Sequence, residues 1–129
     1  MAFDVDQSRR TWDDMIKKYG GLAILRQPNV PDRYIMCMRT QFSAMERLGG
    51  ISNPSDRKIL ISVFVPDTYD LLDPDPCEKD VLVMLILDSN GAPVLDDDGN
   101  PQTKELLKIV APPAPVGPDV LYWRLQVRA

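Results

Sequence analysis

The sequence predicts a mainly β protein, a small barrel or sandwich of five to seven short strands with an N-terminal α-helix. Of the 19 acidic residues 16 are Asp, and the chain also holds 12 Pro. Both residue types favour turns over long helices. The hydrophobic period is near 3.6 in residues 5–19 and close to two in most later segments. The length of 129 residues fits one domain, which we divide into a helical arm (1–20) and a β-barrel domain (21–129).

The helix is predicted over residues 5–19. Asp4 and Asp6 suit the positive end of its dipole, Ser8 could cap it, and Gly20-Gly21 ends it. Its apolar face is formed by Val5, Trp12, Met15, Ile16 and Tyr19, and its polar side by Arg9, Arg10, Asp13 and Asp14. We expect the apolar face either to cover the domain's own sheet or to dock on a neighbouring subunit or partner. The contact residues would then be Trp12, Met15 and Tyr19.

Alternating hydrophobicity predicts strands over most of the remaining chain. The predicted strands are residues 22–26, 32–42, 56–65, 81–87, 92–95, 102–110 and 119–128. Residues 81–87 are apolar on both faces, which favours a central strand. Residues 102–110 fit a helix or a strand by composition, and their β surroundings favour a strand.

Several shorter features complete the prediction. In the closing strand, Leu121, Trp123, Leu125 and Val127 should face the core. Residues 43–46 resemble a capping box that opens one helical turn, and residues 112–118 should form a stiff, extended connection. We identify turn dipeptides at 90–91 and 98–99 but no internal repeat.

The composition argues against catalysis. The chain has no His, which excludes His-based triads and most zinc sites, and two Cys cannot make a four-Cys zinc site. No glycine-rich phosphate loop or EF-hand spacing is present. We therefore predict no catalytic residues, no metal and no cofactor. Cys37 and Cys77 are predicted to be reduced thiols, with a disulfide within or between subunits as the alternative.

Other binding classes are also disfavoured. The N-terminus lacks the apolar core of a signal peptide, and the longest apolar run, residues 81–87, is too short to span a bilayer. The net charge of −4 has the wrong sign for a nucleic-acid-binding protein, and the basic residues are scattered. We therefore expect a chain built for assembly with other proteins.

Two acidic segments stand out. The first, which we call the acidic loop (residues 67–80), is rich in Asp and Pro, and the second is the Asp96-Asp97-Asp98 turn. Loops that are long for a small domain tend to reach a partner. We expect Tyr69, Leu71 and Leu72 in the acidic loop to contact a subunit or partner.

The order of several short motifs resembles a known family. A Gly-Gly-Ile element at 49–51 leads into a strand that opens with Asp-Arg-Lys at 56–58. A proline-rich bend at 112–118 leads into a closing strand that ends in Leu-Gln-Val-Arg. With the strand at 21–28 and the apolar segment that begins at Asp80, this order resembles the head-closure, or head-tail connector, proteins of tailed bacteriophages. The chain departs from them in its acidic loop and in an added turn within residues 88–99.

The resemblance implies a structural virion protein. Copies of such a small β-barrel form a ring in the phage neck, between the portal or adaptor protein and the tail terminator or tail tube, after assembly in the bacterial cytoplasm. DNA passes through the ring without specific binding, and the family has no catalytic residues. An acidic wall would repel DNA phosphates and let the duplex slide. We expect part of the Asp excess to line the channel, the candidates being Asp67, Asp70, Asp73, Asp75, Asp96, Asp97 and Asp98.

Two other functions remain open at this stage. A tail-terminator or other tail-tube protein would need a sheet that stacks into a continuous tube wall. A ligand-binding β-barrel module would need a concave aromatic pocket, yet the chain has only nine aromatic residues.

Overall fold

The computed structural model of the chain describes residues 4–40, 56–66, 68–117 and 119–129. These residues form one helix and seven strands in the order α1 (Val5–Tyr19), β1 (Gly21–Arg26), β2 (Arg33–Thr40), β3 (Arg57–Ser62), β4 (Val81–Leu85), β5 (Thr103–Ile109), β6 (Ala114–Val116) and β7 (Tyr122–Arg128). The mainly β class and the N-terminal helix are confirmed. Residues 102–110 are indeed a strand, and α1 has the predicted bounds.

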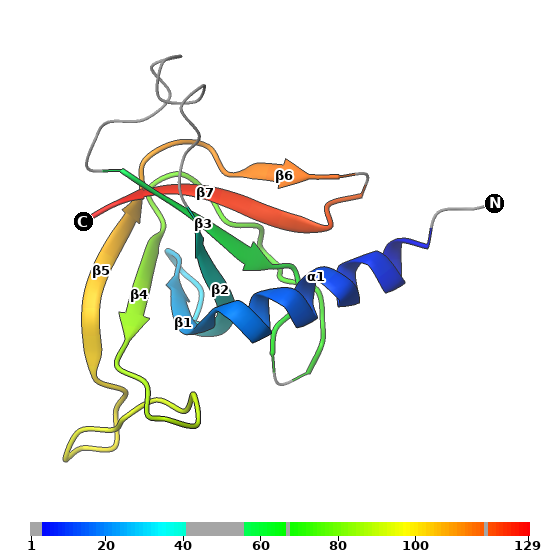
Figure 1. Cartoon of the computed structure of the whole chain (residues 1–129). Helices are drawn as coiled ribbons and strands as arrows, with labels where there is room; N and C mark the ends of the chain where they lie inside the picture. Colours follow the sequence, from blue (N-terminus) through cyan, green and yellow to red (C-terminus); the bar gives the residue numbers. More distant parts are fainter. Residues whose placement is uncertain (1–3, 41–55, 67, 118) are drawn as a thin grey trace.

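Six of the strands close into a barrel. The sheet runs in the order β3-β2-β1-β4-β5-β7-β6, and a further pairing of β3 with β7 closes it. Six residue pairs, from Arg57 opposite Val127 to Ser62 opposite Tyr122, form this closing ladder. The three-residue strand β6 pairs with β7 outside the ring of six, where Figure 1 shows it beside β7. All pairings are antiparallel, and β4 lies between β1 and β5 as a central strand.

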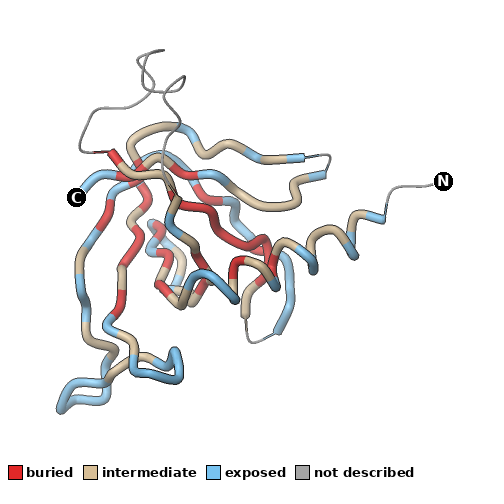
Figure 2. Tube along the Cα trace, in the orientation of Figure 1, coloured by how far each residue is buried: buried red, intermediate tan, exposed pale blue. Residues whose placement is uncertain are grey.

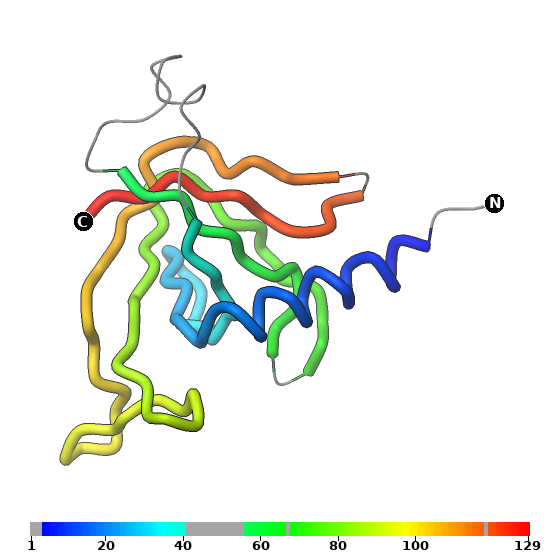
Figure 3. The backbone as a smooth tube through the Cα atoms, in the orientation of Figure 1, coloured from blue at the N-terminus to red at the C-terminus, as the bar shows by residue number. Residues whose placement is uncertain are grey.

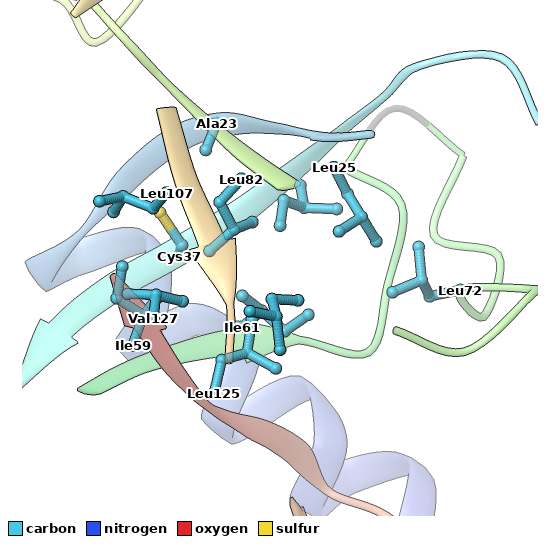
Figure 4. Packing of buried hydrophobic residues seen from close by; sticks show 12 residues of the cluster. Ala23, Leu25, Cys37, Ile59, Ile61, Leu72, Leu82, Leu107, Leu125 and Val127 are labelled. Atoms are coloured by element: carbon cyan, nitrogen blue, oxygen red, sulfur yellow. The ribbon is translucent and has the colours of Figure 1, made fainter. Parts of the chain in front are cut away.

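Apolar side chains fill the inside of the barrel. Buried and less buried residues alternate along β1, β2 and the second half of β7, which indicates that alternate side chains there point inward. Figure 2 shows the buried residues concentrated on the barrel strands. Figure 4 shows these side chains meeting in one cluster, which is composed of Ala23, Leu25, Ile35, Cys37, Ile59, Ile61, Leu72, Leu82, Leu107, Ile109, Leu125 and Val127. Trp123 packs against this cluster, so the predicted inward set of the last strand is confirmed for Trp123, Leu125 and Val127. The barrel interior is therefore a packed core.

Two ion pairs lie at the barrel end where β7 finishes. Asp56, just before β3, is buried, and one of its carboxylate oxygens lies 2.6 Å from Arg128 Nε on β7. Arg57 Nη1 lies 2.6 Å from Glu105 Oε1 on β5. On β5 only Lys108 and Ile109 pair with β7, and Lys108 is opposite Arg128, the last residue of β7. Glu105 comes three residues before Lys108, so the Arg57–Glu105 ion pair links β3 to β5 beyond the end of β7. These contacts reinforce the closure where backbone pairing stops.

Helix α1 packs on the outside of the barrel and contacts β1, β2, β3 and β7. Figure 1 shows it crossing the barrel wall diagonally. Ile16 is fully buried beneath it, and the Trp12 ring lies 4.3 Å from the Tyr122 ring on β7, measured between centroids. The helix thus covers the domain's own sheet. Its N-cap is Asp4, whose Oδ1 accepts from the Gln7 amide at 3.1 Å, and not Ser8.

Asp13 corrects the predicted polar face of α1. Its exposed fraction is 2%, because it faces the barrel and not the solvent. Ser62 Oγ donates to Asp13 Oδ1 at 2.5 Å, and Lys17 Nζ lies 3.0 Å from Asp13 Oδ2. A buried carboxylate is tolerated where charged and neutral donors satisfy it, so Asp13 acts as a polar anchor in the helix–barrel interface. Asp14 is exposed as predicted.

Other boundaries differ from prediction for local reasons. The last strand begins at Tyr122 because Asp119 and Val120 have φ of 57° and 55°, a left-handed conformation that no strand accommodates. Residues 92–95 form no strand but make isolated bridges through Pro93 and Leu95. The helical turn predicted at 43–46 lies outside the described residues. Within the described residues, α1 is too short and polar to cross a membrane.

We predict that Asp13→Ala destabilises the protein by about 2–3 kcal/mol, because it removes a buried hydrogen bond and leaves Ser62 without its acceptor. The control Asp14→Ala, one residue along the same helix, should change the free energy of unfolding by less than about 0.5 kcal/mol. Urea denaturation of both variants measures the difference. Equal effects would show that the polar anchor contributes nothing.

Candidate functional site

The described residues contain no cluster of metal ligands. No group of three or more Cys, Asp or Glu side chains in the described ranges is placed to hold a metal ion. A pocket of about 120 Å³ lies between α1, the acidic loop and the start of β7, with Arg9, Leu71 and Trp123 in its lining. Small-molecule sites usually have volumes of about 300–1,000 Å³, so this pocket is too small for such a ligand. A second hollow of about 410 Å³ is an open depression along the polar side of α1, lined by Asp4, Asp6, Gln7, Arg10, Thr11 and Asp14. We take outer surfaces that could contact other macromolecules as the candidate sites.

The acidic loop is the first candidate surface, and its first half folds against α1. Its backbone is held by hydrogen bonds from Val65 N to Asp70 O and from Tyr69 N to Val65 O, both 2.8 Å. The Lys17 ammonium lies 4.2 Å from the centre of the Tyr69 ring and 2.5 Å from its hydroxyl. Burial alone would lower the pKa of Lys17, but hydrogen bonds to Tyr69 and Asp13 raise it above its ordinary value. Lys17 therefore joins the acidic loop to the helix as a cation.

The predicted contact residues of the acidic loop divide into two groups. The exposed fractions of Tyr69 and Leu71 are 46% and 51%, so both are available to a partner. Leu72 is different, because it is 5% exposed and belongs to the core cluster of the barrel. The expectation that Leu72 contacts a partner is corrected, since the leucine that follows Leu71 points the opposite way.

Gln27 and Arg33 fasten the second half of the acidic loop to the barrel. Gln27 Nε2 donates to the Asp75 carbonyl at 2.9 Å and to Asp80 Oδ2 at 3.0 Å. Arg33 donates to Gln27 Oε1 and to the Asp73 carbonyl. Gln27 and Asp80 are both buried. Hydrophobic period does not reveal this network, and its only signal in the sequence is Gln27, a polar residue followed by a proline at the end of a predicted strand.

The predicted channel-lining residues lie in two separate places. Asp70, Asp73 and Asp75 are exposed on the acidic loop, and Asp67 lies outside the described residues. Asp96, Asp97 and Asp98 are exposed at the far end of the β4–β5 connection. Figure 1 shows this connection and the acidic loop leaving the barrel at different points. Within a single copy, the fold does not gather the six described residues into one acidic patch, and the backbone trace in Figure 3 shows the two segments apart.

The β4–β5 connection is the second candidate surface, and we call residues 86–102 the double-turn arm. Asp88 Oδ1 accepts hydrogen bonds from the amides two and four residues ahead, at 2.8 and 3.0 Å. Asp96 Oδ1 repeats this pattern at 3.0 and 2.9 Å. Gly91 and Gly99 both have φ of 82°, which favours glycine at the same position of each turn. Two equivalent turns therefore follow each other along the arm.

A cycle of backbone hydrogen bonds joins the two turns. The amide of Val94 donates to Ile86, that of Gln102 to Val94 and that of Ile86 to Gln102, at 2.8–3.0 Å. These three residues are eight positions apart. The prediction of no internal repeat is therefore wrong, since Leu-Asp, a variable residue, Asn or Asp, Gly, a variable residue and Pro occur at both 87–93 and 95–101. The two turn dipeptides, eight residues apart, are the sequence signal of this repeat. An eight-residue unit that occurs only twice is much shorter than the periods of 20–50 residues that mark repeat proteins.

The helix is the third candidate surface. Tyr19, at its C-terminal end, is 66% exposed and remains available for a contact. Trp12 and Met15 are half-buried, Trp12 against Tyr122 of the same chain. Arg9 also points toward its own chain, because its guanidinium donates to the carbonyl of Val120 at 3.0 Å and to the carbonyl of Asp119. These are the two left-handed residues that precede β7. The helix thus stabilises the chain's own turns, and among its predicted contact residues only Tyr19 is exposed.

Comparisons of this chain with protein-family models, with curated proteins and with solved structures found no match. The functional assignment therefore depends on the fold, on these three surfaces and on the order of the sequence motifs.

The two cysteines lie in different surroundings and are both free. Cys37 is 4% exposed in the barrel core, and burial raises the pKa of its thiol to about 11. Cys77 is exposed on the acidic loop. The two residues therefore form no disulfide with each other within the chain, and a disulfide between subunits stays the alternative prediction.

We predict that an aromatic disulfide reagent modifies Cys77 and leaves Cys37 unmodified in the folded protein at pH 8. Denaturation should expose both thiols, and Cys77→Ser should leave no reactive thiol in the folded state. Since the ordinary pKa of the thiol is near 9, the unfolded state loses this proton first, so stability should fall as the pH rises from 9 to about 11. Cys37→Ala should remove that part of the pH dependence. Rapid labelling of both thiols in the native state would contradict the prediction.

Proposed function

We propose that this chain is a structural, non-enzymatic protein of the neck of a tailed bacteriophage, where copies form a ring between the portal or adaptor protein and the tail. The single observation that carries the proposal is a barrel whose interior is filled by its own side chains while its extensions lie outside. Such a barrel has no lumen for a ligand and offers only its outer surfaces. The order of motifs that resembles head-closure proteins agrees with this arrangement.

The same observation weighs against the two alternatives. A ligand-binding module with its concave aromatic pocket inside the barrel would need an internal cavity, and the side chains of twelve residues pack in this one. A tail-tube protein needs a sheet that continues from one copy to the next. Here each of the six barrel strands pairs along at least part of both sides, and the outermost strand, β6, is three residues long. Short edge strands discourage pairing between sheets.

Within this proposal, the acidic loop supplies the DNA channel with its acidic wall. Asp70, Asp73 and Asp75 are exposed, and Gln27 and Arg33 hold this part of the loop against the barrel. Fixed negative charges would repel DNA phosphates without forming contacts that must break as the duplex moves. Tyr69 and Leu71, exposed on the same loop, would contact the portal, the adaptor or the tail.

The proposal predicts a stable complex with neck components. The purified chain should co-elute with the portal or adaptor protein of its phage in size-exclusion chromatography with light scattering, and labelled chain should be found at the necks of virions. Leu71→Asp should weaken this complex at least about tenfold, because it places a charge in an apolar contact. Lys18→Asp, an exposed change on α1, serves as the control. A strict monomer that binds neither portal nor tail would refute the proposal, and binding to headless tails alone would favour the tail-terminator alternative.

The channel assignment predicts an effect on DNA movement. Phage assembled with Asp70→Asn, Asp73→Asn and Asp75→Asn should eject DNA more slowly, or retain part of it, because the wall no longer repels the duplex. Time-resolved fluorescence of the released DNA measures the rate. The matched control is Asp6→Asn with Asp14→Asn on α1. Normal ejection kinetics with all three loop residues neutralised would contradict the channel assignment.

A further inference from the structure

A row of apolar side chains crosses the outside of the barrel away from α1. The strand registers place Tyr34 opposite Ile24, Ile24 opposite Val83 and Val83 opposite Leu106, across β2, β1, β4 and β5. On each strand at least one adjacent residue belongs to the core cluster (Ile35, Leu25, Leu82 and Leu107), so alternation directs these four residues outward. We call them the outer row. In the described chain, α1 contacts neither β4 nor β5. Leu106 is 51% exposed, Ile24 and Tyr34 are half-buried and Val83 is 2% exposed, so a partner would reach the outer row mainly at its β5 end.

Basic residues lie beside the outer row on the same face. Arg26 is opposite Val81, and Val81 is opposite Lys108. Arg26 and Lys108 each stand two residues from a member of the outer row, so their side chains leave the barrel on the same side. Both are exposed, and Arg26 also forms a surface ion pair with Asp32 at 3.1 Å. The outer row is thus an apolar strip with positive charge along one margin.

The double-turn arm has the complementary chemistry. It holds four Asp and no Lys or Arg, so its charge of −4 equals that of the whole chain, and the remainder is balanced. Leu95 is 56% exposed and directly precedes Asp96, Asp97 and Asp98. Ile86, at the base of the arm, is 40% exposed. The arm therefore carries exposed apolar side chains beside negative charge.

The conformation of the arm is fixed by its own hydrogen bonds, and the arm extends away from its own barrel. Figure 1 shows it extending beyond the end of β4 and β5, whereas the outer row lies within the strands. Asp88 and Asp96 fix the two turns through their side-chain hydrogen bonds. A preformed loop loses less conformational entropy on binding than a flexible one. Asp98 takes part in these turn hydrogen bonds through its backbone amide only, so the side chains of Asp97 and Asp98 remain available to a partner.

We propose that the double-turn arm of one copy docks on the outer row of the next copy. Leu95 would pack near Leu106, and Asp97 and Asp98 would lie beside Arg26 and Lys108. Because the arm and the outer row are different surfaces, the contact is head-to-tail and repeats from copy to copy, as in a closed ring. The inference deepens the proposed function and depends on it for its setting in the phage neck. A nucleic acid or an anionic membrane on the arm is disfavoured by the negative charge of the arm.

Charge reversal on the two surfaces tests this contact. The arm variant carries Asp97→Lys and Asp98→Lys, and the row variant carries Arg26→Glu and Lys108→Glu. Each variant alone should associate at least about tenfold more weakly than the wild type in sedimentation velocity, since like charges then face each other. An equimolar mixture should recover association, because each arm again meets a row of opposite charge. The recovered oligomer should contain both variants in equal numbers.

Matched controls separate docking from loss of fold or of general charge. Arg10→Glu with Lys18→Glu makes the same charge change on α1 as the row variant and should leave association unchanged. Leu95→Ser and Leu106→Ser should each weaken association, whereas Leu71→Ser, which removes an equally exposed leucine from the acidic loop, should not. Circular dichroism and thermal unfolding confirm that each variant remains folded.

Three outcomes would overturn the inference: a wild-type chain that stays monomeric at millimolar concentration, arm and row variants that associate like the wild type, or a mixture that recovers nothing. Its failure is distinguishable from failure of the proposed function. Charge-dependent rings that bind neither portal nor tail would support the docking and refute the neck assignment. If the chain binds neck components but its arm and row variants still assemble, the neck assignment would be supported and the docking refuted.

Discussion

The pairing of β3 with β7 is the constraint on which the rest of the structure depends. It joins the two ends of the sheet along six residue pairs and turns an open sheet into a closed barrel. Closure removes most exposed strand edges and encloses a narrow interior that apolar side chains fill. Any surface that contacts a partner must therefore lie outside the barrel. The helix, the acidic loop and the double-turn arm are all attached to the outside or the ends of the barrel.

The aspartates of this chain have three distinct roles, although composition makes them look alike. Asp13, Asp56 and Asp80 are buried and satisfied by hydrogen bonds or ion pairs that hold the helix, the barrel end and the acidic loop. Asp88 and Asp96 each close a turn of the arm through backbone amides. The other described aspartates of the acidic loop and the arm are exposed, and these are the ones that we propose act on DNA or on a partner. Neutralising aspartates without regard to these roles would mix losses of stability with losses of function.

Negative and positive charges gather on two different surfaces of the molecule. The arm carries a charge equal to the net charge of the chain, and the basic margin of the outer row lies on another part of the same barrel. A molecule with unlike complementary surfaces can repeat its contacts around a ring without any self-complementary face. The added turn that separates this sequence from head-closure proteins is part of the double-turn arm. The departure in sequence and the proposed contact between copies thus coincide.

The sequence by itself determined the mainly β class, the bounds of α1, the central position of β4 and the inward set of the last strand, because period and turn residues act within a few positions. Only the tertiary structure decided the contacts between distant segments. The burial of Asp13 depends on Ser62, 49 positions away, and the separation of Leu71 from Leu72 depends on where the acidic loop meets the core. The outer row comes from four strands whose registers hydrophobic period alone does not specify. Local patterns record which residues prefer burial, and closure of the barrel decides which of them share a face.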